Sequence, residues 1–173
     1  MQLIIPVAVK PYLKKYLERS LIDAGHPDPL NPFVLNTDTK FGIFLYQCLE
    51  KPGPKLVWTN KGMRHSDLNA DYEIDKTVYS ATLKVMVSEH FWGKIGCIIT
   101  PQKQLHFNKF VYLDFQEEFY RYVKNRIGKK GSINKAIVTF CAHYSIYEDD
   151  LSFRTIQRSF QRRNTVANHS FSA

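Results

Sequence analysis

The sequence predicts an α+β protein in which a mixed region of strands and helices is followed by a helical C-terminal part. Strand-like alternation near the N-terminus and at 81–87, helical spacing in the last third, and a hydrophobic content of 44% over 173 residues support this class. Chains too polar to form a core have a different composition. We therefore expect an α+β region at 1–103, a basic helical module at 104–163 and a flexible tail at 164–173.

Strands and helices are predicted in turn along the first 50 residues. Residues 1–9 are rich in Ile and Val and indicate a buried strand, and Pro11 suits the first turn of a helix that runs to about Ile22. Three prolines and a glycine between 23 and 32 predict a loop. A short strand at 33–35 then leads to a second helix, capped by Asp38 or Thr39, with apolar residues at helical spacing: Phe41, Phe44, Leu45, Cys48 and Leu49.

Three further segments, at 55–59, 71–75 and 81–87, have strand-like patterns. The second carries acidic residues at alternate positions, which suits an edge strand or a loop better than a core strand. The pattern assigns no definite element to 91–99.

Helical spacing dominates the last third of the chain. One helix is expected from near Leu105 to Ile127, ended by Gly128, and Ser132 caps a second helix. After a break at 143–150, a third helix runs from about Leu151 to Arg163. The last two helices form a helix-turn-helix-like pair between Ser132 and Arg163, with a connection longer than the usual three or four residues.

The net charge of +8 is concentrated at the C-terminal end of the sequence. From Arg121 onward there are ten Lys and Arg residues and three acidic ones, a net charge of +7, whereas residues 1–120 carry fourteen and thirteen, a net charge of +1. Concentrated positive charge favours a polyanionic partner.

Nucleic-acid binding without catalysis is the predicted function. Arg side chains make bidentate contacts to guanine edges or phosphates, and Gln makes them to adenine. Duplex DNA is expected in preference to RNA, and the predicted contacts are Arg154, Gln157, Arg158, Gln161, Arg162 and Arg163 on the final helix, with Lys129, Lys130 and Lys135 on phosphates. A solvated basic helix that closes a helical core would have the same composition. Another alternative is a structural or assembly protein, such as a phage particle component, whose basic end docks on an acidic partner, and a homodimer is compatible with either function.

Patterns typical of enzymes are missing from the sequence. No two of the six histidines are one, two or four residues apart, and there is no Cys-x-x-Cys, Gly-rich phosphate loop or Gly-x-Ser-x-Gly elbow, so neither a cofactor nor a metal ion is predicted. A metal-dependent nuclease stays open only through the acidic segment Asp67, Asp71, Glu73 and Asp75 with Lys76. Five aromatic residues could stack on unpaired bases, although core packing explains them better: Trp58, Tyr72, Tyr79, Phe91 and Trp92.

The chain is expected to stay out of membranes and in a reducing compartment. No apolar run reaches the ~18–20 residues that span a bilayer, and the N-terminus lacks a signal-peptide pattern. Cys48, Cys97 and Cys141 are odd in number and have apolar neighbours, which suits buried thiols. These features predict a protein of the cytoplasm or of a phage particle.

Two segments carry a resemblance to known proteins. The stretch Tyr12-Leu13-Lys14-Lys15-Tyr16-Leu17, and the stretch from Tyr144 to Phe153 with the Arg-rich helix that follows, resemble small uncharacterised basic proteins of phages and mobile elements in Bacteroidetes. The resemblance implies a mobile-element context, in which a nucleic-acid-binding protein would act as a regulator or as an accessory to replication or recombination. It implies no specific activity and no site residue.

Overall fold

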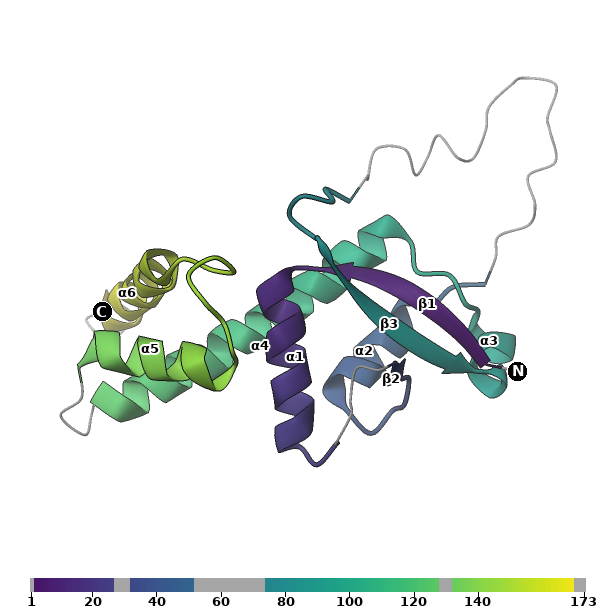
Figure 1. Ribbon diagram of the computed structural model, residues 1–173, viewed down its shortest axis with the longest axis horizontal. Helices are drawn as coiled ribbons and strands as arrows, with labels where there is room; N and C mark the ends of the chain where they lie inside the picture. Colours follow the sequence, from purple (N-terminus) through teal and green to yellow (C-terminus); the bar gives the residue numbers. More distant parts are fainter. Residues whose placement is uncertain (1, 27–31, 52–73, 128–131, 170–173) are drawn as a thin grey trace, which may run out of the picture. The chain divides into compact units, whose positions relative to one another are not determined.

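The computed structural model in Figure 1 describes residues 2–26, 32–51, 74–127 and 132–169, with side chains up to Asn164. Its elements are β1 (Gln2–Val9), α1 (Pro11–Asp23), β2 (Phe33–Val34), α2 (Lys40–Cys48), β3 (Ala81–Ser88), α3 (Glu89–Ile95), α4 (Pro101–Ile127), α5 (Ile133–His143) and α6 (Phe153–His169). The architecture is α+β, as predicted, with the sheet in the N-terminal part and helices in the C-terminal part. The chain divides into two compact units, Met1–Val111 and Tyr112–Ala173. The division falls within α4, whereas the sequence pattern placed it between residues 103 and 104.

The N-terminal unit contains a three-stranded sheet in the order β1-β3-β2. Strands β1 and β3 are antiparallel from Gln2 opposite Ser88 to Val9 opposite Ala81, and β2 adds a two-residue parallel pairing to β3. Side chains alternate between the two faces of the sheet. The buried face consists of Ile5, Val7 and Val9 from β1 and Leu83, Val85 and Val87 from β3.

The outer edge of β1 is occupied by side chains of α4. Gln104 Oε1 accepts a hydrogen bond from the Ala8 backbone N–H at 2.9 Å, and Asn108 Nδ2 donates to the Ala8 carbonyl oxygen at 2.8 Å. Asn108 Oδ1 also accepts from the backbone N–H of Lys10 at 3.2 Å. Pro6, two residues before Ala8, has no N–H to offer at this edge. Among the described elements, the outer edge of β1 therefore lies against α4 and not against another strand.

Helices α1 and α2 form where the sequence predicts them. Helix α1 starts at Pro11 and buries Leu13, Tyr16, Leu17 and Leu21, the predicted apolar face. Helix α2 is capped by Thr39, whose Oγ1 accepts a hydrogen bond from the backbone N–H of Gly42 at 3.0 Å. Its Phe44 ring stacks on Phe110 of α4, with the ring centroids 4.3 Å apart.

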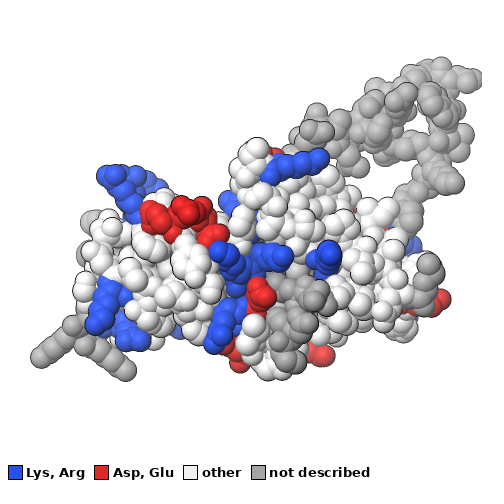
Figure 2. All heavy atoms as spheres, in the orientation of Figure 1, with Lys and Arg blue, Asp and Glu red and all other residues white. Residues whose placement is uncertain are grey.

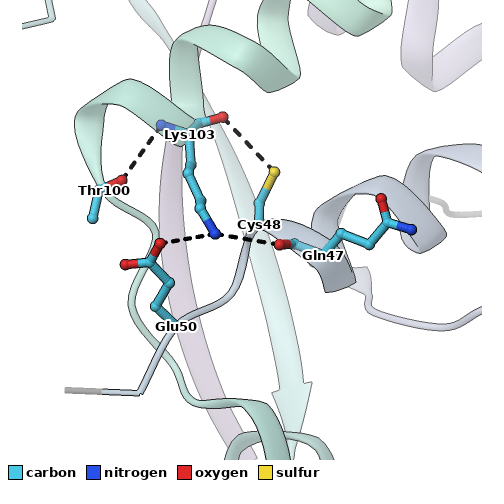
Figure 3. Close-up of polar contacts among 5 residues, drawn as sticks. All are labelled: Gln47, Cys48, Glu50, Thr100 and Lys103. Carbon is cyan, nitrogen blue, oxygen red and sulfur yellow. Dashed lines mark hydrogen bonds and ion pairs between the residues drawn. The ribbon is translucent and has the colours of Figure 1, made fainter. Parts of the chain in front are cut away.

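A small polar cluster ties the C-terminal end of α2 to the first turn of α4 (Figure 3). Lys103 Nζ lies 2.8 Å from Glu50 Oε1 and donates to the carbonyl oxygen of Gln47 at 3.4 Å. Lys103 also accepts, at its own carbonyl oxygen, a hydrogen bond of 3.9 Å from Cys48 Sγ. The bond from Lys103 Nζ satisfies the carbonyl of Gln47, one of the last carbonyls of α2, which a helix end leaves without a partner in the helix.

Three helix boundaries differ from the sequence prediction. Helix α4 begins at Pro101 and not near Leu105, because Thr100 Oγ1 accepts a hydrogen bond from the Lys103 N–H at 3.4 Å and proline suits a first helical turn. Residues 89–95, for which no element was expected, form α3. Helix α6 continues to His169, six residues into the expected tail, since residues 164–169 contain no Gly or Pro to end it. The strand expected at 55–59 lies outside the described residues, as does most of 71–75.

The C-terminal unit has a core made largely of aromatic rings. Phe140 of α5 lies 5.2 Å from Phe119 of α4, and Phe160 of α6 lies 6.2 Å from the same ring, all between ring centroids. Helix α5 lies across the view in Figure 1 and α6 is seen nearly end-on, so their axes cross. The connection between them, residues 144–152, is anchored by Ile146, which is 1% exposed. The connection is longer than a usual helix-turn-helix turn because part of it packs into the core of the unit. None of the described helices is long and apolar enough to cross a membrane.

Candidate nucleic-acid interface

The outer surface of α6 carries a row of three arginines. Arg154, Arg158 and Arg162 follow one another at four-residue intervals and are all exposed. The helix buries Ile156 and Phe160 on its opposite side. Within the described residues, none of the three guanidinium groups pairs with a carboxylate. We call this surface, made of Arg154, Arg158 and Arg162, the arginine face.

Helix α6 contains no acidic residue, and the acids that precede it have structural contacts. A carboxylate oxygen of Glu148 accepts a hydrogen bond of 2.9 Å from the Phe153 N–H at the start of the helix. Asp150 Oδ2 accepts one of 2.9 Å from the Tyr147 N–H within the connection. Figure 2 shows acidic groups gathered over this connection and basic groups beside them on the same unit. The negative charge therefore sits at the helix N-terminus, where the helix dipole favours it.

Two of the predicted contact residues bind side chains of neighbouring helices. Arg163 pairs with Glu117 of α4, and its guanidinium carbon lies 4.4 Å from the centroid of the Tyr120 ring. Gln157 is half-buried and donates a hydrogen bond to Asn134 Oδ1 of α5 at 3.2 Å. Gln161 is exposed beside the arginine face. The structure thus separates the arginine face from Arg163 and Gln157, which join α6 to its neighbouring helices.

The predicted phosphate contact Lys135 lies on α5 beside a hollow of about 450 Å³. Arg126, in the last turn of α4, lines the same hollow, and its guanidinium carbon lies 5.4 Å from the centroid of the Tyr122 ring. Sequence reasoning did not select Arg126, although its place in a helix's final turn next to a basic segment is a visible signal. Lys129 and Lys130 lie outside the described residues.

Most residues of the acidic segment considered as a metal site, and two of the aromatic residues considered for base stacking, are not described by the structure. Asp67, Asp71, Glu73, Trp58 and Tyr72 lie outside the described residues. Asp75 is exposed and accepts hydrogen bonds from Thr77 Oγ1 at 2.6 Å and from the Thr77 N–H at 2.9 Å. These bonds hold the pKa of the Asp75 carboxyl below its usual value. Its neighbour Lys76 is also exposed.

Three of the aromatic residues considered for base stacking lie outside the described strands of this unit. Phe91 and Trp92 are half-buried on α3, and Phe91 makes an edge contact with Tyr46, with ring centroids 5.4 Å apart. Tyr79 is half-buried, and Lys10 Nζ lies 5.6 Å from its ring centroid. None of these three rings belongs to a described strand, so an open sheet face of stacking aromatics is not formed by them.

The thiols of Cys48 and Cys141 are poor nucleophiles. Burial raises the pKa of Cys141 to about 11 and also raises the pKa of Cys48, so both thiols are protonated at neutral pH. Among the side chains that the structure describes, no three His, Cys, Asp or Glu residues come together in a group that could hold a metal ion.

The structural division changes how the charge is distributed. Residues 1–111 contain fourteen basic and ten acidic residues, a net charge of +4, and residues 112–173 contain ten and six, also +4. The C-terminal unit includes three acids, Asp114, Glu117 and Glu118. They precede Arg121 and so lie outside the basic stretch from Arg121 to the C-terminus. Net charge therefore does not distinguish the two units.

Comparisons with protein-family models, with curated proteins and with solved structures find no match to this chain.

Proposed function

We propose that the C-terminal unit binds duplex DNA through the arginine face of α6. The observation that carries the proposal is the exposure of Arg154, Arg158 and Arg162 on one side of a helix that contains no acid. The first and last of them are eight residues apart, about 12 Å along the helix axis, which is comparable with the width of the major groove. Arginines placed in this way can contact phosphates or guanine edges.

The helices around α6 support the same use. Helices α5 and α6 cross, as the two helices of a helix-turn-helix unit do, and such a unit places its second helix in the major groove. Lys135 and Arg126 could then contact the DNA backbone from α5 and α4. In this proposal the protein acts as a regulator or as a replication or recombination accessory of a phage or mobile element, without catalysis of its own.

The proposal is tested by replacing Arg154, Arg158 and Arg162 together with Ala in the full chain. We expect loss of duplex binding at moderate salt, and the slope of log affinity against log salt concentration should fall by about 3, because up to three phosphate contacts are lost. The matched control removes the same charge from exposed positions of α4, with Lys109, Arg121 and Lys124 replaced by Ala. Circular dichroism checks that both variants keep their helices.

Equal loss of affinity in the two triple variants would show that only net charge matters and would overturn the assignment to α6. If the unaltered protein does not bind duplex DNA even at low salt, DNA binding itself is overturned. The basic end would then be assigned to an acidic protein partner.

A further inference from the structure

A groove of about 800 Å³ lies between α4 and α6 in the C-terminal unit. Its volume is within the range of sites that hold small ligands, about 300–1,000 Å³. We call it the α4–α6 groove, and its lining includes Tyr112, Gln116 and Tyr120 of α4 and Arg158, Ser159 and Arg162 of α6. No acidic residue is among them.

One aromatic ring in this groove is open to a ligand. Tyr112 is 37% exposed, and within the described residues its ring makes no contact with another aromatic ring or with a cation. Tyr120, by contrast, is covered by Arg163 and lies 5.4 Å from Phe160 between ring centroids. Tyr112 is therefore the ring on which a planar group can stack.

The ring is held in place by a polar side chain from the floor of the groove. Gln116 Nε2 donates to the hydroxyl oxygen of Tyr112 at 2.6 Å and to Ser159 Oγ of α6 at 3.1 Å. The bond to Tyr112 lies within α4, and the bond to Ser159 connects α4 to α6. A ring fixed in this way loses little conformational freedom when a ligand stacks on it.

Two arginines of the arginine face also line the groove. Arg158 and Arg162 are exposed and belong to both surfaces, whereas the third arginine of the groove, Arg163, is held by Glu117. The groove thus presents a stacking ring, two guanidinium groups and small hydroxyl side chains within one concave surface. This combination matches the parts of a nucleotide, a flat base and a phosphate.

We propose that the α4–α6 groove holds an unpaired nucleotide, with its base on the ring of Tyr112 and the adjoining phosphates at Arg158 and Arg162. The inference rests on the proposed function, since the two surfaces share these arginines. Bases inside a duplex have both faces covered by their neighbours, and only an unpaired base offers a face to an aromatic side chain. The protein should therefore prefer duplexes that carry a single-stranded extension.

The test compares a blunt duplex with the same duplex extended by a short single strand that contains 2-aminopurine. We expect the extended duplex to bind about tenfold more tightly, the effect of one stacked base, and the 2-aminopurine fluorescence to fall as the base stacks. Tyr112→Ala should remove the preference and the fluorescence change while it leaves the affinity for the blunt duplex unaltered. Tyr112→Phe, which keeps the ring, should retain both. Leu113→Ala, at the next position of α4 and 53% exposed, is the control that should change neither.

The outcomes separate this inference from the proposed function. If the blunt duplex binds through the arginine face but the extension adds no affinity, or if Tyr112→Ala keeps the preference, the groove assignment is overturned and duplex binding stands. If a single strand binds in a Tyr112-dependent way and the blunt duplex does not bind, the duplex proposal falls and the groove stands. No binding of either probe overturns both.

Discussion

The two units of this protein carry the same formal charge and use it in different ways. In the N-terminal unit the charges of α1 are mixed, with Glu18 among the lysines and Arg19 paired with Asp23 at 3.0 Å. In the C-terminal unit α6 carries four arginines and no acid. Glu117 of α4 pairs with Arg163, and the other three arginines of α6 pair with no carboxylate among the described residues. The comparison shows that a surface suited to a polyanion depends on local separation of charge, which a net charge does not describe.

The two units also differ in the contacts that hold each interior together. In the N-terminal unit a buried polar residue, Asn108, connects α4 to the edge of β1 through hydrogen bonds. In the C-terminal unit the helices meet through rings, with Phe140 contacting Phe115, Phe119, Tyr122 and Tyr144. Substitutions that remove one kind of contact in one unit can establish whether the units are stabilised independently.

The largest expected effect comes from Phe140→Ala in the C-terminal unit. Phe140 is 1% exposed, and removal of its ring should lower the free energy of unfolding by about 3–5 kcal/mol. The chain has no tryptophan after Val111, and Trp92 is half-buried on α3, so tryptophan fluorescence reports on the N-terminal unit. We expect the denaturation midpoint measured by circular dichroism to move and the tryptophan midpoint to stay. Equal shifts in both signals would show that the two units unfold together.

The reciprocal substitution, Asn108→Ala, should act on the N-terminal unit. It leaves the Ala8 carbonyl and the Lys10 N–H without their partner on α4, at a cost of about 1–3 kcal/mol for a buried group left unsatisfied. The tryptophan midpoint should fall, whereas the affinity for duplex DNA should remain. Lys109→Ala, at the next and exposed position of α4, is the matched control. A loss of DNA affinity in Asn108→Ala would contradict the separation of the two units.

A smaller effect distinguishes two arginines within α6. Arg163→Ala removes an exposed ion pair with Glu117 and a contact with Tyr120, so it should lower stability by less than about 1 kcal/mol. Arg158→Ala should leave stability unchanged but reduce the salt dependence of duplex binding by about one phosphate contact. Thermal denaturation and salt titrations of the two variants measure this difference. If Arg163→Ala flattens the salt dependence as much as Arg158→Ala does, the arginine face extends to Arg163.

The smallest expected effect is a dependence of stability on alkaline pH. The unfolded Cys141 thiol loses its proton near pH 9.0, whereas burial raises the pKa of the folded one to about 11. Between these values the unfolded state releases a proton that the folded state keeps, so stability falls as the pH rises. Urea denaturation at pH 8 and pH 10 should show a smaller decrease for Cys141→Ala than for the unaltered protein. An equal decrease in the two proteins would contradict the assignment to Cys141.

The sequence contained enough information for most helices and for the two long strands, because their apolar residues repeat with clear helical or strand periods. The parallel pairing of β2 has no local signal, since it joins Phe33 to Val85 across 52 positions of the chain. The start of α4 lies at Pro101, a residue that suits a first helical turn but adds nothing to the apolar period. The periodic pattern alone placed the start four residues later.

The candidate site was predictable only in part for the same reason. The four arginines of α6 look alike in the sequence, and what separates Arg163 from the others is Glu117, 46 residues earlier on another helix. Tyr112 could not be predicted as a binding residue either, because its place in a site depends on the groove that α4 and α6 form together. The concentration of charge after Arg121 was correct as a count, but the structural unit also includes three acids that precede it.

The edge of β1 has a consequence for self-association. Exposed strand edges allow two copies of a protein to join their sheets, which leads to filaments and aggregates at high concentration. Here Pro6 offers no donor, Ala8 is bonded to Gln104 and Asn108, and the opposite edge is formed by a strand of only two residues. A palindromic site for the proposed DNA binding would bring two copies together. Among the described elements, those copies would then meet through helices and not through strand edges.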